Sequence, residues 1–101
     1  MPIANYMFQG PWSITTTTMI NCTCVYVVFN PAIRPYRFLA VGLNDTGYPL
    51  NDHRSFGLWN CMSIGDLYYA VFPTPPELYS MEERQAIVED LILICKPLCP
   101  N

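Results

Sequence analysis

The sequence SMEERQAIVEDLILIC, from Ser80 to Cys95, has the start signal and the apolar spacing of an α-helix. Ser80 and Glu83 match the S-x-x-E pattern of a capping box. In that motif the serine hydroxyl accepts from the N–H of Glu83, and the glutamate carboxylate accepts from the N–H of Ser80. Pro97 ends the run, because a proline ring disfavours the α conformation of the preceding residue. We therefore predict a helix over residues 80–95.

The apolar residues of this predicted helix recur three or four positions apart and form one broad stripe, which we expect to be its core face. The members of the stripe are Ile87, Val88, Leu91, Ile92, Ile94, Cys95 and Leu98. Two residues break the pattern, since Arg84 projects into the stripe and Leu93 projects from the acidic side. Arg84 either extends its charge past the helix end or pairs with a carboxylate across an interface.

The first sixty or so residues have the composition of a sheet. Residues 14–29 are rich in Thr, Val, Ile and Tyr and contain neither Gly nor Pro, which is typical of strands. Residues 36–43 (YRFLAVGL) and 56–61 (FGLWNC) predict two further strands. Turn residues separate these strands at 30–35 and 44–47. We expect an antiparallel sheet of three to five strands, covered on one face by the C-terminal helix.

The fold class predicted from these patterns is α+β, in a single domain that spans residues 1–101. Residues 1–13 mix Pro and Gly with aromatics and predict an irregular aromatic arm. The sheet is expected over 14–61 and the helical part over 63–99. Ser63 and Asp66 repeat the N-cap pattern, and Pro73 supplies a stop.

This second capping pattern predicts a short helix at 64–71. The alternative is a strand over LYYAVF, residues 67–72, because its residues are β-branched and aromatic.

The composition leaves few charges to cover the surface. Charged residues make up 13% of the 101 residues, against about 25% in an average soluble protein, and 51% of the chain is hydrophobic. Seven Tyr are also present, and tyrosine supplies a large rigid contact area with a polar tip. We expect a homodimer or an obligate protein partner, the alternative being a monomer with many half-exposed tyrosines.

The charge distribution argues against nucleic acid as a partner. The formal net charge is −3, and the five cations do not cluster as a phosphate-binding surface requires. Residues 77–90 carry five carboxylates opposed by Arg84 alone, hence a charge of −4. A solvated helix face is the simplest explanation of this segment. No run approaches the eighteen or so apolar residues of a membrane span, so no membrane is expected.

The cysteine count and the N-terminus indicate the compartment. Five cysteines, an odd number, do not suggest a disulfide framework, and the first residues lack the basic region of a signal peptide. We expect a cytoplasmic protein with reduced thiols, in the host cytoplasm if the protein is viral.

Cysteine chemistry is the alternative function that the sequence allows. Cys22 and Cys24 would share one face of a strand, and Cys95 and Cys99 lie at the helix end, so four thiolates could bind zinc if these two places meet. Cys61 and His53 could form a nucleophilic pair. Neither spacing matches a known motif, and buried cysteines and a solvated histidine are the simpler explanation. We therefore predict no cofactor, no metal and no enzymatic activity.

Binding is the function that the sequence favours. Arg34 and Arg37 bracket Tyr36, and these residue types are enriched in interface hot spots. Trp12 of the arm, and Glu82 and Glu89 of the helix, complete the predicted partner-binding residues. Two solvated arginines at a strand start would be the simpler interpretation of the first three residues.

We expect a non-catalytic module that occludes or bridges a partner protein. A small acidic protein without catalytic motifs has the profile of the inhibitors that phages carry against host defences, although this is an analogy of class. A structural subunit of a larger assembly is a further alternative.

Overall fold

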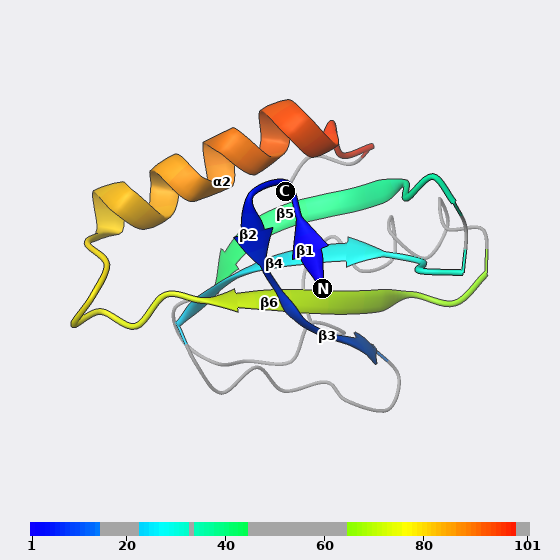
Figure 1. Cartoon of the computed structure of the whole chain (residues 1–101), viewed down its shortest axis with the longest axis horizontal. Coiled ribbons are helices and arrows are strands. Elements are labelled where there is room, and N and C mark those ends of the chain that lie inside the picture. Colours follow the sequence, from blue (N-terminus) through cyan, green and yellow to red (C-terminus); the bar gives the residue numbers. More distant parts are fainter. Residues whose placement is uncertain (15–22, 33, 45–64, 99–101) are drawn as a thin grey trace.

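The computed structural model of the chain describes residues 1–14, 23–32, 34–44 and 65–98. Within these ranges it contains a two-stranded sheet, a four-stranded sheet and an α-helix, and every strand pairing is antiparallel (Figure 1). The small sheet is a hairpin, and the large sheet has the strand order β3-β6-β4-β5. The elements are β1 (Pro2–Ile3), β2 (Tyr6–Met7), β3 (Gln9–Ser13), β4 (Cys24–Phe29), β5 (Phe38–Asn44), β6 (Tyr68–Pro73) and α2 (Met81–Cys95).

β4 is one of the two interior strands of the large sheet, and all six of its residues are buried. It pairs with β5 on one side and with β6 on the other, so that Val27 lies opposite both Val41 and Ala70. The sequence CVYVVF is apolar at both odd and even positions, and such a strand is stable only when both faces of the sheet are covered. The strand composition therefore accounts for its interior place.

α2 and the β1–β2 hairpin cover the same face of the large sheet (Figure 1). The Tyr6 hydroxyl of β2 donates a hydrogen bond of 2.9 Å to Oδ2 of Asp90 on α2, which joins the two covering elements. The buried residues of this layer are Ile3, Phe8, Val25, Val27, Phe29, Val41, Ala70, Ile87, Val88 and Leu91. The opposite face is also buried, through Ile14, Cys24, Tyr26, Val28, Leu39, Ala40, Leu67, Tyr69 and Val71.

The ends of α2 follow from local chemistry. The amide of Glu83 donates to the hydroxyl of Ser80 at 3.1 Å, and the amide of Ser80 donates to the carboxylate of Glu83 at 3.0 Å, so the predicted capping box is confirmed. Lys96 adopts a left-handed conformation at φ 49°, and its amide donates to the carbonyl of Ile92. The helix ends there, one residue before Pro97.

The α+β class and the C-terminal helix are confirmed, but the short helix at 64–71 is wrong. Residues 68–73 form β6, which pairs with β3 and β4 at once. Residues 65–67 are not helical either. The β-branched and aromatic side chains of this segment lie between two neighbouring strands, and this tertiary burial outweighs the local N-cap pattern. Ser63 and Ile64 lie outside the described residues.

The irregular arm at 1–13 is also wrong. These residues form β1, β2 and β3, and the hairpin buries Ile3 and Phe8 in the core. Pro11 is tolerated because β3 lies at the end of the strand order, beside a register shift between Gln9 and Trp12. The arm is therefore part of the domain.

The predicted bounds of the other strands agree with the structure in part. The strand predicted at 14–29 is present as β4, from Cys24 onward, while 15–22 lie outside the described residues. The strand predicted at 36–43 is present as β5, which begins two residues later, at Phe38. The strand predicted at 56–61 and the turn residues 45–47 also lie outside the described ranges.

No helix in the described part of the chain has the length and apolar character needed to cross a bilayer.

Candidate functional site

The outward side of α2 carries apolar side chains that are largely or partly exposed. The five consecutive apolar residues Leu91 to Cys95 are about 100° apart and so go round the whole helix. Leu91 is fully buried and Cys95 is half-buried against the core, whereas Leu93 is 75% and Ile94 is 52% exposed. We call the exposed residues Ile92, Leu93, Ile94 and Leu98 the α2 apolar patch.

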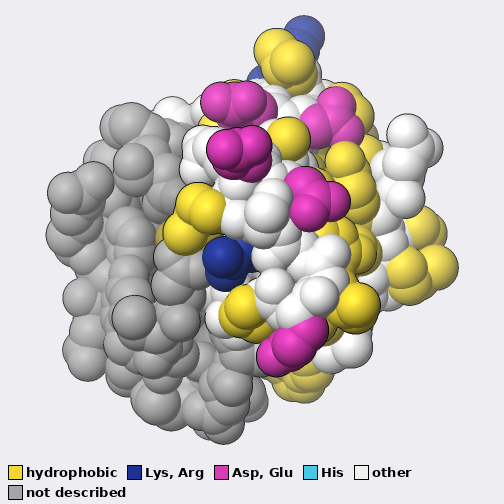
Figure 2. Space-filling view, turned by 90° about the vertical axis from the view of Figure 1, so that its left-hand side faces the viewer, with side chains coloured by type: hydrophobic (Ala, Val, Ile, Leu, Met, Phe, Trp, Pro, Cys, Tyr) yellow, Lys and Arg dark blue, Asp and Glu magenta, His cyan; other side chains and the backbone are white. Residues whose placement is uncertain are grey.

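The first two thirds of the helix carries the acidic residues. Glu82, Glu83 and Glu89 are exposed, and we call these three the α2 acidic surface. Figure 2 views the end of the molecule where α2 begins, and it shows Asp and Glu side chains gathered on its upper part, with hydrophobic side chains between and beside them. Asp90 is half-buried and accepts the hydrogen bond of Tyr6. The outward side of α2 therefore changes from acidic to apolar along its length.

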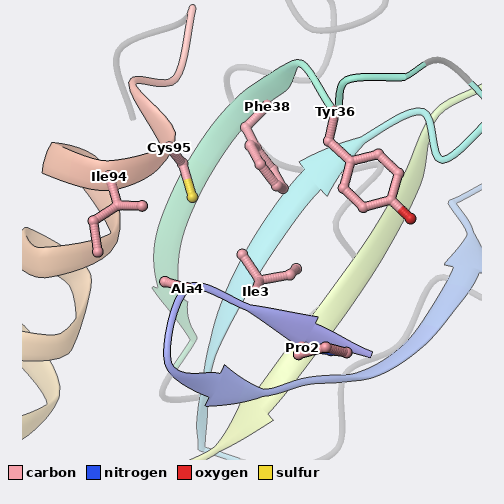
Figure 3. Close-up of a pocket in the computed structure, with 7 residues that line it drawn as sticks. All are labelled: Pro2, Ile3, Ala4, Tyr36, Phe38, Ile94 and Cys95. Carbon is pink, nitrogen blue, oxygen red and sulfur yellow. The ribbon is translucent and has the colours of Figure 1, made fainter.

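A pocket lies beside the apolar patch, between the C-terminal end of α2, the β1–β2 hairpin and the start of β5 (Figure 3). Its volume is about 240 Å³. The lining residues are Pro2, Ile3, Ala4, Tyr36, Phe38, Ile94 and Cys95, and we call this cavity the Cys95 pocket. Its lining side chains are apolar except for the Tyr36 hydroxyl and the Cys95 thiol. Ile94 belongs both to the pocket and to the patch, so the two surfaces are continuous.

The Cys95 thiol is poorly suited to nucleophilic chemistry. Burial raises the pKa of this thiol above its ordinary value, which lowers the fraction of thiolate at neutral pH. Neither Cys95 nor Cys24 forms a disulfide.

The zinc hypothesis needs Cys24 and Cys95 to meet, and the fold keeps them apart. Cys24 lies in the core on one face of the large sheet, whereas Cys95 packs with α2 against the other face. Among the described residues, no three Cys, His, Asp or Glu side chains lie close enough to hold a metal ion. Cys22, Cys99, Cys61 and His53, which the alternative hypotheses also need, lie outside the described residues.

The structure brings Arg34 and Tyr36 together. The guanidinium carbon of Arg34 lies 5.2 Å from the centre of the Tyr36 ring, within the range of a cation–π contact. The ring is half-buried, with its edge toward Phe29 at 5.2 Å between centroids. Arg37 is exposed in the same loop. Tyr36 therefore acts first as a packing residue, and it presents one side to the Cys95 pocket.

The remaining predicted binding residues lie elsewhere. Trp12 on β3 packs against Tyr69, with ring centroids 5.7 Å apart, and Tyr69 belongs to the core of the face that α2 does not cover. Glu82 and Glu89 share the outward side of α2. The six predicted residues therefore fall in three places, and the structure does not unite them in one surface.

The sequence patterns assigned Ile92, Ile94 and Leu98 to the core, and this was wrong. The buried side of α2 consists of Arg84, Ile87, Val88 and Leu91. A run of five apolar residues exceeds what a helix with one buried side needs, and this excess is the signal that could have identified the exposed residues.

Comparison of the chain with models of protein families, with curated proteins and with solved structures found no match.

Proposed function

We propose that the protein is a non-catalytic protein-binding module that occludes or bridges a partner protein. The observation that carries this proposal is the α2 apolar patch. A helix that is hydrophobic on all sides is ordinarily buried on all sides, yet the last turns of α2 contact the sheet on one side only. Covering the other side would remove Leu93 and Ile94 from water, which is favourable in proportion to the apolar area buried.

Of the two modes of action, we favour occlusion of a partner's surface. A small acidic inhibitor, of the kind that phages carry against host defences, would act in this way. The support for this mode is the general likeness of this protein to such inhibitors in size and charge. We propose that the protein acts in the cytoplasm, because Cys24 and Cys95 are in no disulfide. A homodimer built on the same patch is the second form of the proposal.

The test is site-specific photo-crosslinking within the cells in which the protein is naturally made. Benzoylphenylalanine in place of Leu93 is expected to give one discrete adduct, either with another protein or with a second copy of the chain. The same photoreactive residue in place of Gln9, which is exposed on β3, serves as the matched control. Mass spectrometry identifies the adduct, and calorimetry with both purified proteins then measures the stoichiometry.

A variant separates binding from folding. Leu93→Ser is expected to abolish the calorimetric binding and to change the free energy of unfolding by less than about 0.5 kcal/mol, because the side chain contacts water. Adducts that are the same from position 93 as from position 9 would refute the proposal.

A further inference from the structure

We infer that the partner of α2 is a protein segment that is both apolar and basic, with one apolar side chain that enters the Cys95 pocket and cations that face the α2 acidic surface. This inference rests on the proposed function and specifies the chemistry of the partner. It follows from the size of the pocket, from the charges of α2 and from the order in which the apolar and acidic surfaces lie along the helix.

The pocket suits a single side chain. Its volume of about 240 Å³ is below the roughly 300 to 1,000 Å³ of sites that bind cofactors and drug-sized ligands. Ile3 and Phe38 lie between the helix end and Tyr36, and the Tyr36 hydroxyl is at the end of the ring that points away from α2 (Figure 3). An aliphatic or aromatic anchor could therefore pack against the side chains of Ile3, Phe38 and Ile94. Interface hot spots are commonly anchors seated in pockets of this kind.

The charges of α2 require cations from the partner. Glu82, Glu83 and Glu89 are exposed, whereas Arg84 is turned inward, and its Nε donates to the carbonyl of Ser80 at 3.4 Å. The other cation of this region, Lys96, lies past the C-terminal end of the helix. A partner that covered the carboxylates without supplying positive charge would incur their desolvation cost. Complementary charges would instead speed association and fix its register.

The same charges disfavour a second copy of the chain. Antiparallel pairing of two α2 helices along their full length would place the apolar patch of one copy against Glu82 and Glu89 of the other. Parallel pairing would place acidic surface against acidic surface, and like charges in an interface oppose association.

The order of the apolar patch and the acidic surface along α2 sets the distance between the partner's apolar anchor and its basic residues. Ile94 is five residues from Glu89 and twelve from Glu82, which corresponds to about 8 Å and about 18 Å along the helix axis. Arg34 is stacked on Tyr36, which lines the pocket together with Ile94. The basic residues of the partner must therefore follow its apolar anchor in the direction of the α2 N-terminus, and they must avoid the side of Arg34.

The probe for this inference is a fluorescein-labelled 18-residue amphipathic peptide of Leu and Lys, titrated with the full-length protein. Two matched peptides replace every Lys by Glu or every Leu by Ser. Anisotropy is expected to show binding of the Leu/Lys peptide alone, weakening as salt is added. In methyl NMR spectra the signals of Ile3 and Ile94 are expected to shift, and that of the core residue Ile87 to stay in place.

Three variants test the contacts. Ile94→Ser is expected to weaken binding of the Leu/Lys peptide by about tenfold, through loss of the anchor site. Glu89→Gln is expected to weaken it by about threefold and to reduce its salt dependence. Asp66→Asn removes the same charge from an exposed position before β6, and it should leave the affinity unchanged.

The failure of this inference is distinct from the failure of the proposed function. Three outcomes overturn the inference. They are equal binding of the Lys and Glu peptides, binding that Ile94→Ser does not weaken, and no binding of any peptide. A crosslink from position 93 to a second copy of the chain also overturns it, although that result supports a protein-binding function. Identical crosslinking from positions 93 and 9 overturns the function itself.

Discussion

Arg84 shows how a single residue can break a pattern and still fit the fold. It lies on the buried side of α2, where an isolated charge would be costly. Its Nε donates to the carbonyl of Ser80, which is the N-cap residue. The Arg84 side chain therefore reaches back to the start of the helix, whereas its pairing with a carboxylate across an interface stays a prediction.

Thr74 has a buried hydroxyl without a hydrogen-bond partner among the described residues. The residue lies just after β6 and is fully buried. Because an unsatisfied buried hydroxyl destabilises the folded state, Thr74→Val is expected to raise the free energy of unfolding by about 1 kcal/mol. Urea denaturation measures the change.

The matched control is Thr74→Ser, which keeps the hydroxyl and removes a methyl group. That variant is expected to be less stable than the native protein by about 0.8 kcal/mol. A valine variant that is less stable than the native protein would mean that the hydroxyl is bonded in solution.

At the scale of the element, the start of α2 depends on a reciprocal pair of hydrogen bonds. Ser80→Ala removes the hydroxyl that accepts from Glu83. We expect this variant to lose about 1 kcal/mol of unfolding free energy, because one amide of the first turn loses its acceptor. The midpoint of a urea transition measures the loss.

Ser80→Thr is the control, since it keeps the capping oxygen and should stay within about 0.5 kcal/mol of the native protein. An alanine variant with an unchanged midpoint would show that the helix does not depend on this cap.

At the scale of the whole molecule, one hydrogen bond joins parts of the chain that are 84 residues apart. The Tyr6 hydroxyl on the N-terminal hairpin donates to Asp90 on α2, and the Tyr6 ring packs edge-on against Phe72 of β6 at 5.3 Å. Tyr6→Phe keeps the ring and removes this bond. We expect a loss of about 1 kcal/mol of unfolding free energy at pH 7. Tyr79→Phe is the control, because no hydrogen bond of its hydroxyl is found among the described residues.

Because of the same hydrogen bond, we expect the free energy of unfolding to depend on pH in the alkaline range. Burial, and then the hydrogen bond to Asp90 and its charge, raise the pKa of Tyr6 above the ordinary value of 10.0. Because the pKa of Tyr6 is higher in the folded than in the unfolded protein, its contribution to stability is fully present below pH 10. This contribution is lost as the pH rises through the pKa of Tyr6 in the folded protein. The stability difference between the native protein and Tyr6→Phe should therefore be constant from pH 7 to 9 and decrease above pH 10. A difference that grows above pH 10 would contradict this assignment.

The sequence alone determined those features that depend on residues close together in the chain. The capping box at Ser80 and Glu83 depends on residues three apart, and the burial of β4 follows from a strand that is apolar on both faces. The α+β class follows from these elements. Part of the candidate site was also accessible, since Glu82, Glu89 and Leu93 were all placed on the outward side of the predicted helix.

Only the tertiary structure decided which surfaces meet. The short helix at 64–71 became β6 because pairing with two neighbouring strands outweighed its N-cap signal. The N-terminal residues are part of the core because Ile3 and Phe8 pack against the same face of the sheet as α2. The Cys95 pocket brings Pro2 and Cys95 to one place, and Ile94 is half-exposed beside it. Such contacts between distant segments depend on packing, which no local spacing encodes.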